Sequence, residues 1–479
     1  MKTNMFHIPS TEVTFHRSSF ADPKGRVFWW EGQLYRGITH ENVDFVVQLF
    51  QDGVVQNLMD KGLLIQTELT DLSLDGYGLV LRHRMVPFVS YCYEWSPEML
   101  NDAALLIVDL ELELTRYGLT LQDAHPWNVL FNGPRPVYVD FSSICPDGGH
   151  QLWRAHEEFC RFFIHPLQLT LHGYGRLARW LMQDPYQGVL KSEVTALIRH
   201  GSLGFAIEGT VRETVRRLVS GAKQCVPTPL RPVAKKVFAF LKATLARPET
   251  IEPRLAFVHK LRQDVAAITI PTRHTGWSEY YKDSYPPFTP SEEWTQKHRS
   301  VHRVFSDLHP SSVLDIGSNR GWYSELAARL GSNVVALDTD EFCIVQLYSV
   351  AREKNLPILP LVMDFCLPSP GYGVCYQEGA PAMRRLNCDL VLALALVHHL
   401  VFGRHLNFEQ ISDGLATFSK RWLLVEFISG EDEALQRTWS QKHSWYTLEN
   451  CLAALGKAFR TIKSYPSETE HRILLLCEK

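Results

Sequence analysis

At 479 residues the chain is too long for one ordinary hydrophobic core, so its length predicts two or three domains. It carries 49 basic and 52 acidic residues, a net charge of −3, which gives no reason to expect a nucleic acid or an anionic membrane as partner. An apolar content of 45% is that of a globular protein.

The apolar runs and the cysteines of the sequence indicate the cellular compartment. The longest apolar run, residues 390–397, is far too short to span a bilayer, and the sequence begins without the apolar core of a signal peptide. Ten cysteines are scattered without a C-x-x-C pair, so we expect free thiols rather than a disulfide framework or a zinc site. These features predict a cytoplasmic protein without a metal site, and they say nothing about its oligomeric state.

The first quarter of the chain alternates strand and helix patterns. It predicts a hairpin over 25–38 around Glu31-Gly32, a helix over 45–61, strands over 63–68 and 78–83, and a helix over 99–117. A glycine follows each helix, as expected just past a helix end.

Three polar residues then follow at a characteristic spacing. Asp123 and Asn128 are five positions apart, and Asp140 opens an Asp-Phe-Ser sequence after a short predicted strand. This arrangement resembles the catalytic core of protein kinases and aminoglycoside phosphotransferases. The resemblance implies that Asp123 orients an attacking hydroxyl and that Asn128 and Asp140 hold magnesium, with Mg-ATP as the cofactor of this part.

The same segment departs from the kinase pattern. Leu121-Gln122 stand where a histidine is usual, Ser142 replaces a glycine, and no G-x-G-x-x-G loop precedes them. The nearest cation to the expected lysine position is Arg36, and arginine is not equivalent to lysine at a phosphate. Three interpretations stay open: an active small-molecule kinase, a degenerate kinase fold that keeps these residues for folding or ligand binding, and chance similarity on an unrelated α+β domain.

Residues 146–270 have a mostly helical pattern, including a helix over 157–169 broken at Pro166. They would complete a kinase-like domain over 1–270. A segment rich in proline and aromatic residues then opens a second domain over 271–479.

The second domain starts with a helix signal. Thr289 is a candidate N-cap, Pro290 suits the first helical position, and Glu292 can close a capping box. We therefore expect a helix from Thr289 to about Leu308.

A strand, a glycine turn, a helix and a second strand follow, over 312–316, 317–321, 322–330 and 333–337. Gly317 and Gly321 allow a sharp turn and close approach of a ligand, and Asn319 tolerates a left-handed backbone. The N–H groups at the helix start favour a carboxylate. Asp338 ends the second strand about 20 residues after the turn, where an acid accepts both hydroxyls of a ribose.

This turn resembles the D-x-G-x-x-x-G signature of class I S-adenosylmethionine (SAM) methyltransferases. The alternative is a strand-helix-strand unit with a tight turn and no ligand. The resemblance implies SAM as cofactor, and it implies that an acid and an aromatic residue after the third strand, Asp364 and Phe365, hold the adenine. The expected cofactor-binding residues are Asp315, Gly317, Ser318, Asn319, Gly321, Asp338, Thr339, Asp364, Phe365 and Ala395.

Further strands are predicted over 358–363, 389–396 and 422–428, with an antiparallel pair over 459–465 and 472–477, and helices over 341–354, 407–418 and 446–455. The fold class is α/β: a C-terminal seven-stranded Rossmann-like methyltransferase sheet with an N-terminal α+β kinase-like domain. The long connection 366–388 is assigned to the substrate side, because long loops often carry function.

His398 and His399 follow the fourth strand, near where the methyl group should lie in this fold. We expect His398 as base or orienting group, His399 as second choice, and Glu426 as a weaker candidate. Tyr280, Tyr281 and Lys297 either reach the SAM carboxylate or substrate, or pack over the sheet edge.

Three stretches, LDIGSNRGWYS, VVALDTDE and DLVLALALVHHL, together resemble the rhizobial host-specific nodulation methyltransferases and related two-part bacterial proteins. The expected function is methyl transfer from SAM to an O or N acceptor on a small molecule or glycan, with the kinase-like half binding acceptor or nucleotide. Two alternatives stay open: a bifunctional enzyme that phosphorylates and then methylates, and a non-enzymatic binding module.

Overall fold

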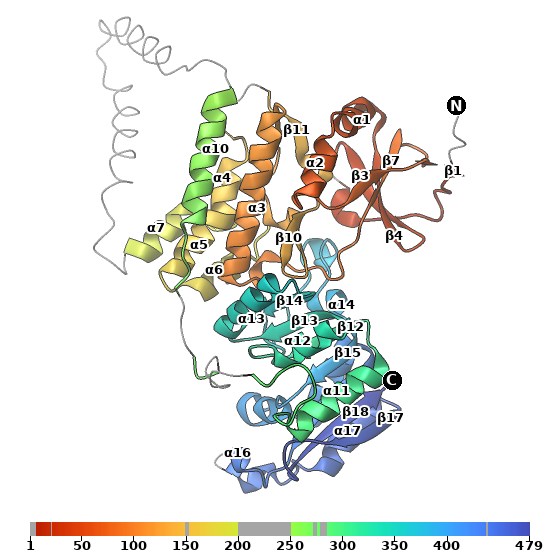
Figure 1. Cartoon of the computed structure of the whole chain (residues 1–479), viewed down its shortest axis with the longest axis vertical. Coiled ribbons are helices and arrows are strands. Elements are labelled where there is room, and N and C mark those ends of the chain that lie inside the picture. Colours follow the sequence, from red (N-terminus) through yellow and green to blue (C-terminus); the bar gives the residue numbers. More distant parts are fainter. Residues whose placement is uncertain are drawn as a thin grey trace, which may run out of the picture. The chain divides into compact units, whose positions relative to one another are not determined.

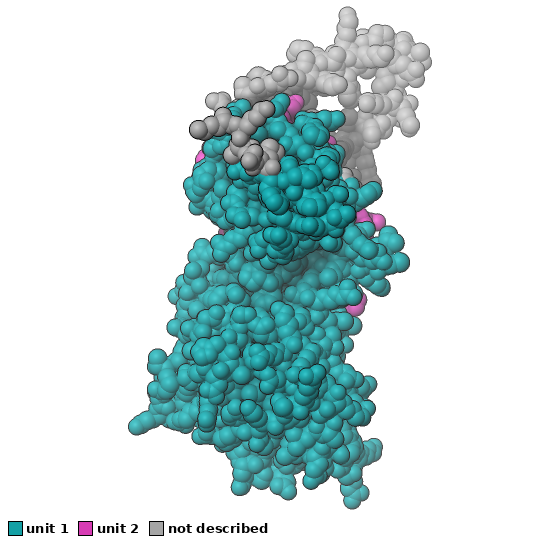
Figure 2. All heavy atoms as spheres, turned by 90° about the vertical axis from the view of Figure 1, so that its right-hand side faces the viewer, with its two compact units in different colours: residues 1–106, 126–142, 270–479 teal, residues 107–125, 143–269 magenta. Residues whose placement is uncertain are grey.

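The computed structural model describes residues 6–20, 22–148, 153–199, 251–271, 275–277, 285–436 and 439–479 (Figure 1). The chain divides into two compact units (Figure 2). Unit 1 comprises residues 1–106, 126–142 and 270–479, and unit 2 comprises 107–125 and 143–269. The boundary expected near residue 270 between two functional domains stays a prediction.

Unit 1 contains a five-stranded antiparallel sheet in the order β2-β3-β4-β7-β5, with bounds Thr14–Phe15, Gly25–Trp30, Gln33–Ile38, Leu79–His83 and Thr67–Leu69. The hairpin predicted over 25–38 is confirmed as β3 and β4. Its turn residues Glu31 and Gly32 have φ of 46° and 71°, the left-handed pair that suits the twist of a tight hairpin.

The helix predicted over 45–61 is two helices, α1 (Val43–Gln51) and α2 (Val54–Asp60). They separate at Gly53, whose φ of 72° is incompatible with a continuing right-handed helix. The strand predicted over 63–68 is also shorter, because Leu64 forms only an isolated bridge with Tyr138 and regular pairing begins at β5.

Unit 1 has two smaller strand pairs, β9 (Val129–Asn132) with β10 (Arg135–Tyr138) and β1 (Phe6–His7) with β6 (Leu72–Ser73). Helix α3 (Pro97–Arg116) begins in unit 1 and continues in unit 2, where β8 (Leu119–Leu121) pairs with β11 (Ile144–Pro146).

Unit 2 is otherwise helical in its described residues: α4 (His156–Phe159), α5 (His165–Leu171), α6 (Gly175–Leu181), α7 (Lys191–Arg199) and α10 (Ile251–Ala266). The break predicted at Pro166 is wrong. A π-helical turn, Cys160–Ile164, leads directly into α5, and Pro166 lies in its first turn. A wider turn just before a proline accommodates the missing N–H without ending the helix.

The C-terminal sheet has seven strands in the order β14-β13-β12-β15-β16-β18-β17. Their bounds are β12 Ser312–Ile316, β13 Asn333–Asp338, β14 Ile358–Val362, β15 Cys388–Ala393, β16 Ser419–Ile428, β17 Thr461–Pro466 and β18 Arg472–Glu478. The first five strands of that order are parallel, and β18 is antiparallel to both neighbours. The predicted seven-stranded sheet with its antiparallel closing pair is confirmed.

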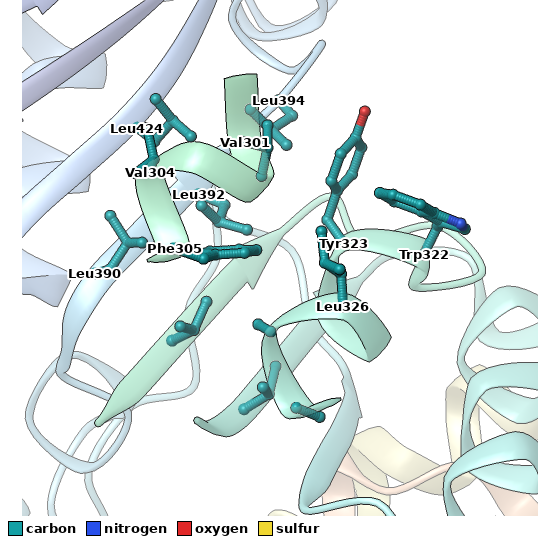
Figure 3. Packing of buried hydrophobic residues seen from close by; sticks show 14 of the residues in the cluster. Val301, Val304, Phe305, Trp322, Tyr323, Leu326, Leu390, Leu392, Leu394 and Leu424 are labelled. Atoms are coloured by element: carbon teal, nitrogen blue, oxygen red, sulfur yellow. The ribbon is translucent and has the colours of Figure 1, made fainter. Parts of the chain in front are cut away.

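The sheet is accompanied by α11 (Gln296–Leu308), α12 (Trp322–Arg329), α13 (Glu341–Glu353), α15 (Phe408–Phe418) and α17 (Leu448–Ala458), with the short α14 (Ala382–Arg385) and α16 (Glu433–Gln436) between strands. Figure 3 shows how Val301 and Phe305 of α11 and Leu326 of α12 pack with Leu390 and Leu392 of β15. This packing fixes the carboxyl ends of the central strands relative to α12, whose N-terminus follows the glycine turn.

The helix expected to start at Thr289 starts later. Thr295 is the N-cap of α11: its hydroxyl accepts from the backbone N–H of His298, and His298 reciprocates as the third residue of a capping box. Trp294, directly before this cap, is buried and donates to the carbonyl of Pro287. Burial of Trp294 therefore outweighs the earlier capping pattern.

Candidate functional site

The turn between β12 and α12 uses three left-handed residues. Gly317, Asn319 and Gly321 have φ of 74°, 51° and 80°. A Cβ on Gly321 would lie 2.5 Å from Cδ1 of Leu347, and one on Gly317 would lie 3.3 Å from Cδ1 of Leu396. The turn therefore needs glycine at both ends, and asparagine fills the conformation expected of it between them.

The N–H groups of this turn are used within the protein. Gly317 and Ser318 both donate to the carbonyl of Leu337, and Asn319 donates to Oδ2 of Asp338 at 2.7 Å. Oδ1 of Asp338 accepts from Asp340 N–H at 2.8 Å. A carboxylate ligand must therefore rely on the start of α12 rather than on the turn itself.

The carboxylate of Asp338 keeps hydrogen-bond acceptor capacity for a ligand despite these bonds. Burial raises the pKa of its carboxyl group, while the donated backbone N–H groups oppose that rise. Each carboxylate oxygen has a second lone pair, which a ribose hydroxyl can use. The glycine cradle and the acid at the end of β13 fit an adenosine-containing group such as SAM.

Asp315, also expected at the cofactor, supports the turn from beneath. Its carboxylate is buried and accepts from the hydroxyl of Ser324 at 2.6 Å. Burial raises the pKa of Asp315 to about 6, with the Ser324 bond acting in the opposite direction. The visible contact joins β12 to α12, so the geometry shows a positioning role for this side chain.

Asp364 and Phe365 follow β14 as expected, but both have protein partners. Oδ2 of Asp364 lies 2.6 Å from Nη2 of Arg404, a cation that the sequence analysis did not single out. Phe365 packs toward Gly414 of α15, where an added Cβ would lie 2.7 Å from its ring. An adenine amino group would have to share Asp364 with Arg404.

A short segment before α11 contributes to the same edge. The carbonyl of Trp277 accepts from Nδ2 of Asn319 at 3.0 Å, and Thr275 bonds to Asp340 beside the exposed Thr339. The Trp277 ring lies 5.3 Å from that of His399. Sequence reasoning placed Tyr280 and Tyr281 here; both lie outside the described residues.

His398 and His399 lie together after β15, with ring centroids 4.0 Å apart. His398 is 8% exposed, and its Nδ1 has no hydrogen-bond partner among the described residues. Burial, with the charge of neighbouring groups, lowers the pKa of His398 to about 3, and burial also lowers the pKa of His399. Both imidazoles are therefore neutral at physiological pH, as a proton acceptor must be.

Glu426 is fully buried and held on every side. Its carboxylate accepts from Lys297 Nζ at 2.7 Å, from Ala395 N–H at 2.9 Å and from Ser467 Oγ at 2.5 Å. Ala395 has a left-handed φ of 50°, so the bond to Glu426 fixes an unusual backbone at the end of β15. These contacts make Glu426 a positioning group for the strand end, and they pair it with the buried Lys297 of α11.

The kinase-like residues fall in both units. In unit 1, Arg36 on β4 pairs with Asp22 at 2.6 Å and with Asp140 at 3.2 Å. Burial raises the pKa of Asp140, and the Arg36 charge opposes that rise. Asn128 reaches Tyr138 Oη at 3.5 Å in the same unit, whereas Asp123 belongs to unit 2.

The long connection 366–388 contacts residues from the N-terminal part of unit 1. Arg385 is 4% exposed, pairs with the fully buried Glu94, and places its guanidinium 3.8 Å above the Tyr91 ring. Tyr372 lies 4.4 Å from the ring of Trp127. A substrate role for this connection stays a prediction.

Comparison with known proteins gives one curated relative along nearly the whole chain. Nodulation protein NoeA of Rhizobium meliloti (strain 1021) is 26% identical over 481 residues, covering 96% of this chain and 95% of the relative. No family model matches the chain.

Among solved structures, magnesium protoporphyrin IX methyltransferase from Synechocystis PCC 6803 is 17% identical (TM-score 0.26), covering 38% of this chain and 78% of its own. The N-methyltransferase NodS from Bradyrhizobium japonicum WM9 is 13% identical (TM-score 0.27), covering 38% and 93%. Monomeric WbdD is 16% identical (TM-score 0.27), covering 37% and 38%. At these scores the similarities carry no functional inference.

The C-terminal part has the fold of a SAM-dependent methyltransferase. Its strand order, its D-x-G-x-x-x-G turn and the acid that ends β13 are the features of that fold. In the described part of the chain, no helix has the length and apolar character needed to cross a membrane.

Proposed function

We propose that this protein transfers a methyl group from SAM to an oxygen or nitrogen acceptor on a small molecule or glycan. The observation that carries the proposal is the left-handed turn from Gly317 to Gly321 beside Asp338. Bound SAM would supply an activated methyl group. The protein then has to orient the acceptor and keep water out.

The residues at the strand ends would have separate roles in binding the cofactor, accepting a proton and positioning the strand. Asp338 would hold the ribose, and Asp364, with Arg404 beside it, would meet the adenine edge. The neutral His398 would accept a proton from a hydroxyl or protonated amine acceptor, an effect worth about 10²–10⁴-fold in rate. Glu426 would keep Ala395 and the end of β15 in place through its backbone bond.

Isothermal titration with SAM tests the proposal directly. We expect Asp338→Ala to weaken SAM binding about 10- to 100-fold, because bonds between ribose hydroxyls and a charged group are lost. Asp307→Ala is the matched control: Asp307 is an exposed acid on α11 that pairs with Arg303 on its own helix. Equal SAM affinity in wild type and Asp338→Ala would remove Asp338 from the site.

We further propose that the kinase-like part binds the acceptor or a nucleotide rather than transferring phosphate. The pairing of Arg36 with Asp140 supports this, because the guanidinium occupies the carboxylate expected to hold magnesium. Thermal unfolding with and without Mg-ATP detects binding, and labelled ATP detects transfer. Phosphate incorporation into a product would instead support a bifunctional kinase and methyltransferase.

A further inference from the structure

Two adjoining pockets lie in unit 1 away from the glycine turn. One has a volume of about 740 Å³ and is lined by Phe88, Pro381, Arg384 and Lys420 among others. The second, of about 610 Å³, is lined by Arg17 and also by Pro381 and Arg384. Because they share two residues, the pockets form one hollow centred on Arg384.

This hollow is at the opposite edge of the sheet from the SAM site. Lys420 lies at the start of β16, and α14 with Arg384 comes just before β15. The turn at Gly317 and the histidines instead follow the carboxyl ends of parallel strands. The six-residue strand β15 spans roughly 20 Å from its amino end, near the hollow, to its carboxyl end, near the histidines. A small ligand in the hollow therefore cannot also be the methyl acceptor.

The charge of the hollow is one-sided. Arg17, Arg384 and Lys420 are exposed, and no acidic residue lines either pocket. In the described part of the chain, neither Arg17 nor Arg384 has an ion pair or side-chain hydrogen bond. Lys420 Nζ lies 4.0 Å from Oδ1 of Asp389, a long ion pair, while Oδ2 of that carboxylate accepts from the N–H groups of Ser311 and Ser312.

The buried Arg385 differs from these cations. It also lines the larger pocket, but Glu94 compensates its charge. Arg17, Arg384 and Lys420, whose ion pair with Asp389 is 4.0 Å long, give this concave surface an excess of positive charge. Such a surface favours a multiply charged oxyanion, and a guanidinium matches phosphate geometry especially well.

The shape of the hollow narrows the ligand class further. Its volume falls in the range of small-molecule sites, and Phe88, Pro381 and Met383 give it apolar walls. We propose that it binds a small organic phosphate, with the dianion at Arg384 and Lys420 and the organic part against the apolar wall. This proposal does not depend on methyl transfer.

Phenyl phosphate is a suitable probe, because it joins a dianion to an apolar ring. Titration calorimetry on the full chain should show binding at millimolar concentration or better, with Arg384→Gln weakening it at least about tenfold. Lys420→Gln should also lower the affinity for phenyl phosphate. Phenyl sulfate has the same shape with a single charge and should bind distinctly more weakly, as should inorganic phosphate, which lacks the ring.

Arg421→Gln is the matched control, since this neighbouring exposed cation pairs with Glu478 and stacks on Trp422, outside the hollow. The control should bind phenyl phosphate like wild type. The proposal is overturned if wild type shows no binding, if Arg384→Gln binds equally well, if both arginine variants lose the same affinity, or if phenyl sulfate binds as tightly. SAM affinity should be unchanged in all three variants, which separates a folding defect from loss of this site.

Discussion

His398 combines a buried ring, a nitrogen without a hydrogen-bond partner in the described part of the chain, and a neutral charge state after β15. We expect His398→Ala to leave SAM affinity unchanged and to slow methyl transfer about 10²–10⁴-fold, because the proton acceptor is lost. Single-turnover rates with the true acceptor, together with SAM titration, separate the two effects. His443→Ala serves as control, and equal turnover in His398→Ala would reject a catalytic role.

The same residue gives stability a defined pH dependence. The pKa of His398 falls from 6.5 to about 3 in the folded protein. The unfolded chain therefore binds a proton below pH 6.5 that the folded protein excludes. The His398 contribution is full above that pH and declines by about 1.4 kcal/mol per pH unit as pH falls toward 3.

Urea unfolding of wild type and His398→Gln at several pH values measures this term. The stability difference between the two proteins should shift in favour of the variant as the solution is acidified below pH 6.5. Other buried histidines contribute equally to both proteins and cancel. A difference that is constant with pH would show that His398 titrates normally.

For single residues, the sequence predicted local backbone conformation better than it predicted contacts between side chains distant in the chain. Asn319 was expected to adopt a left-handed backbone because asparagine tolerates it, and its φ of 51° agrees. Arg404 beside Asp364, by contrast, comes from a segment 40 positions away, and nothing in the local sequence signals that pairing.

At the scale of elements, the glycine turn depends on its fit against α13. A left-handed backbone at a residue other than glycine costs roughly 1–2 kcal/mol. Gly321→Ala should lower the free energy of unfolding by more than this amount, because the new methyl group meets the Leu347 side chain. It should also weaken SAM binding by displacing the start of α12. Urea unfolding and SAM titration measure both effects.

Gly331→Ala provides the matched control for this substitution. Gly331 also has a left-handed φ, 99°, but an added Cβ meets no atom of the described residues within 4 Å. The control therefore carries the backbone strain without the clash. Equal losses of stability in the two variants would show that the contact with Leu347 is unimportant.

The elements differ in how well local patterns predict them. The parallel strands were found because burial on both faces forces continuous apolar runs, as in β15. Helix starts and breaks were less reliable: Thr289 offered a plausible cap, yet burial of Trp294 moved the start of α11 to Gln296. Gly53 divided α1 from α2 although the apolar spacing continued across it.

At the scale of the whole chain, unit 1 unites residues far apart in sequence. The buried pair of Arg385 and Glu94 joins positions 291 apart. Removing one partner leaves an uncompensated buried charge, so we expect Glu94→Gln to destabilise unit 1 by about 3–5 kcal/mol. No local pattern predicts such a pair, because Glu94 ends a 3-10 turn and Arg385 ends the short helix α14, and the sequence between them gives no sign that the two ends meet.

Chemical unfolding followed by intrinsic fluorescence measures the Glu94→Gln effect. Glu409→Gln is the control, since its pair with Lys457 is exposed on both sides and should contribute little. A double variant in which Arg385→Met accompanies Glu94→Gln should recover part of the lost stability. If Glu94→Gln matches its control, the pair does not stabilise unit 1.

The partly exposed ion pair between Arg404 and Asp364 has one further consequence. Dissolved ions weaken attraction between charges that water can reach, so concentrated salt loosens the arginine while the carboxylate stays at the end of β14. An adenine competing for that carboxylate then meets less opposition. The affinity for SAM should therefore rise with salt concentration. A site that attracts its ligand by net charge would show the opposite dependence.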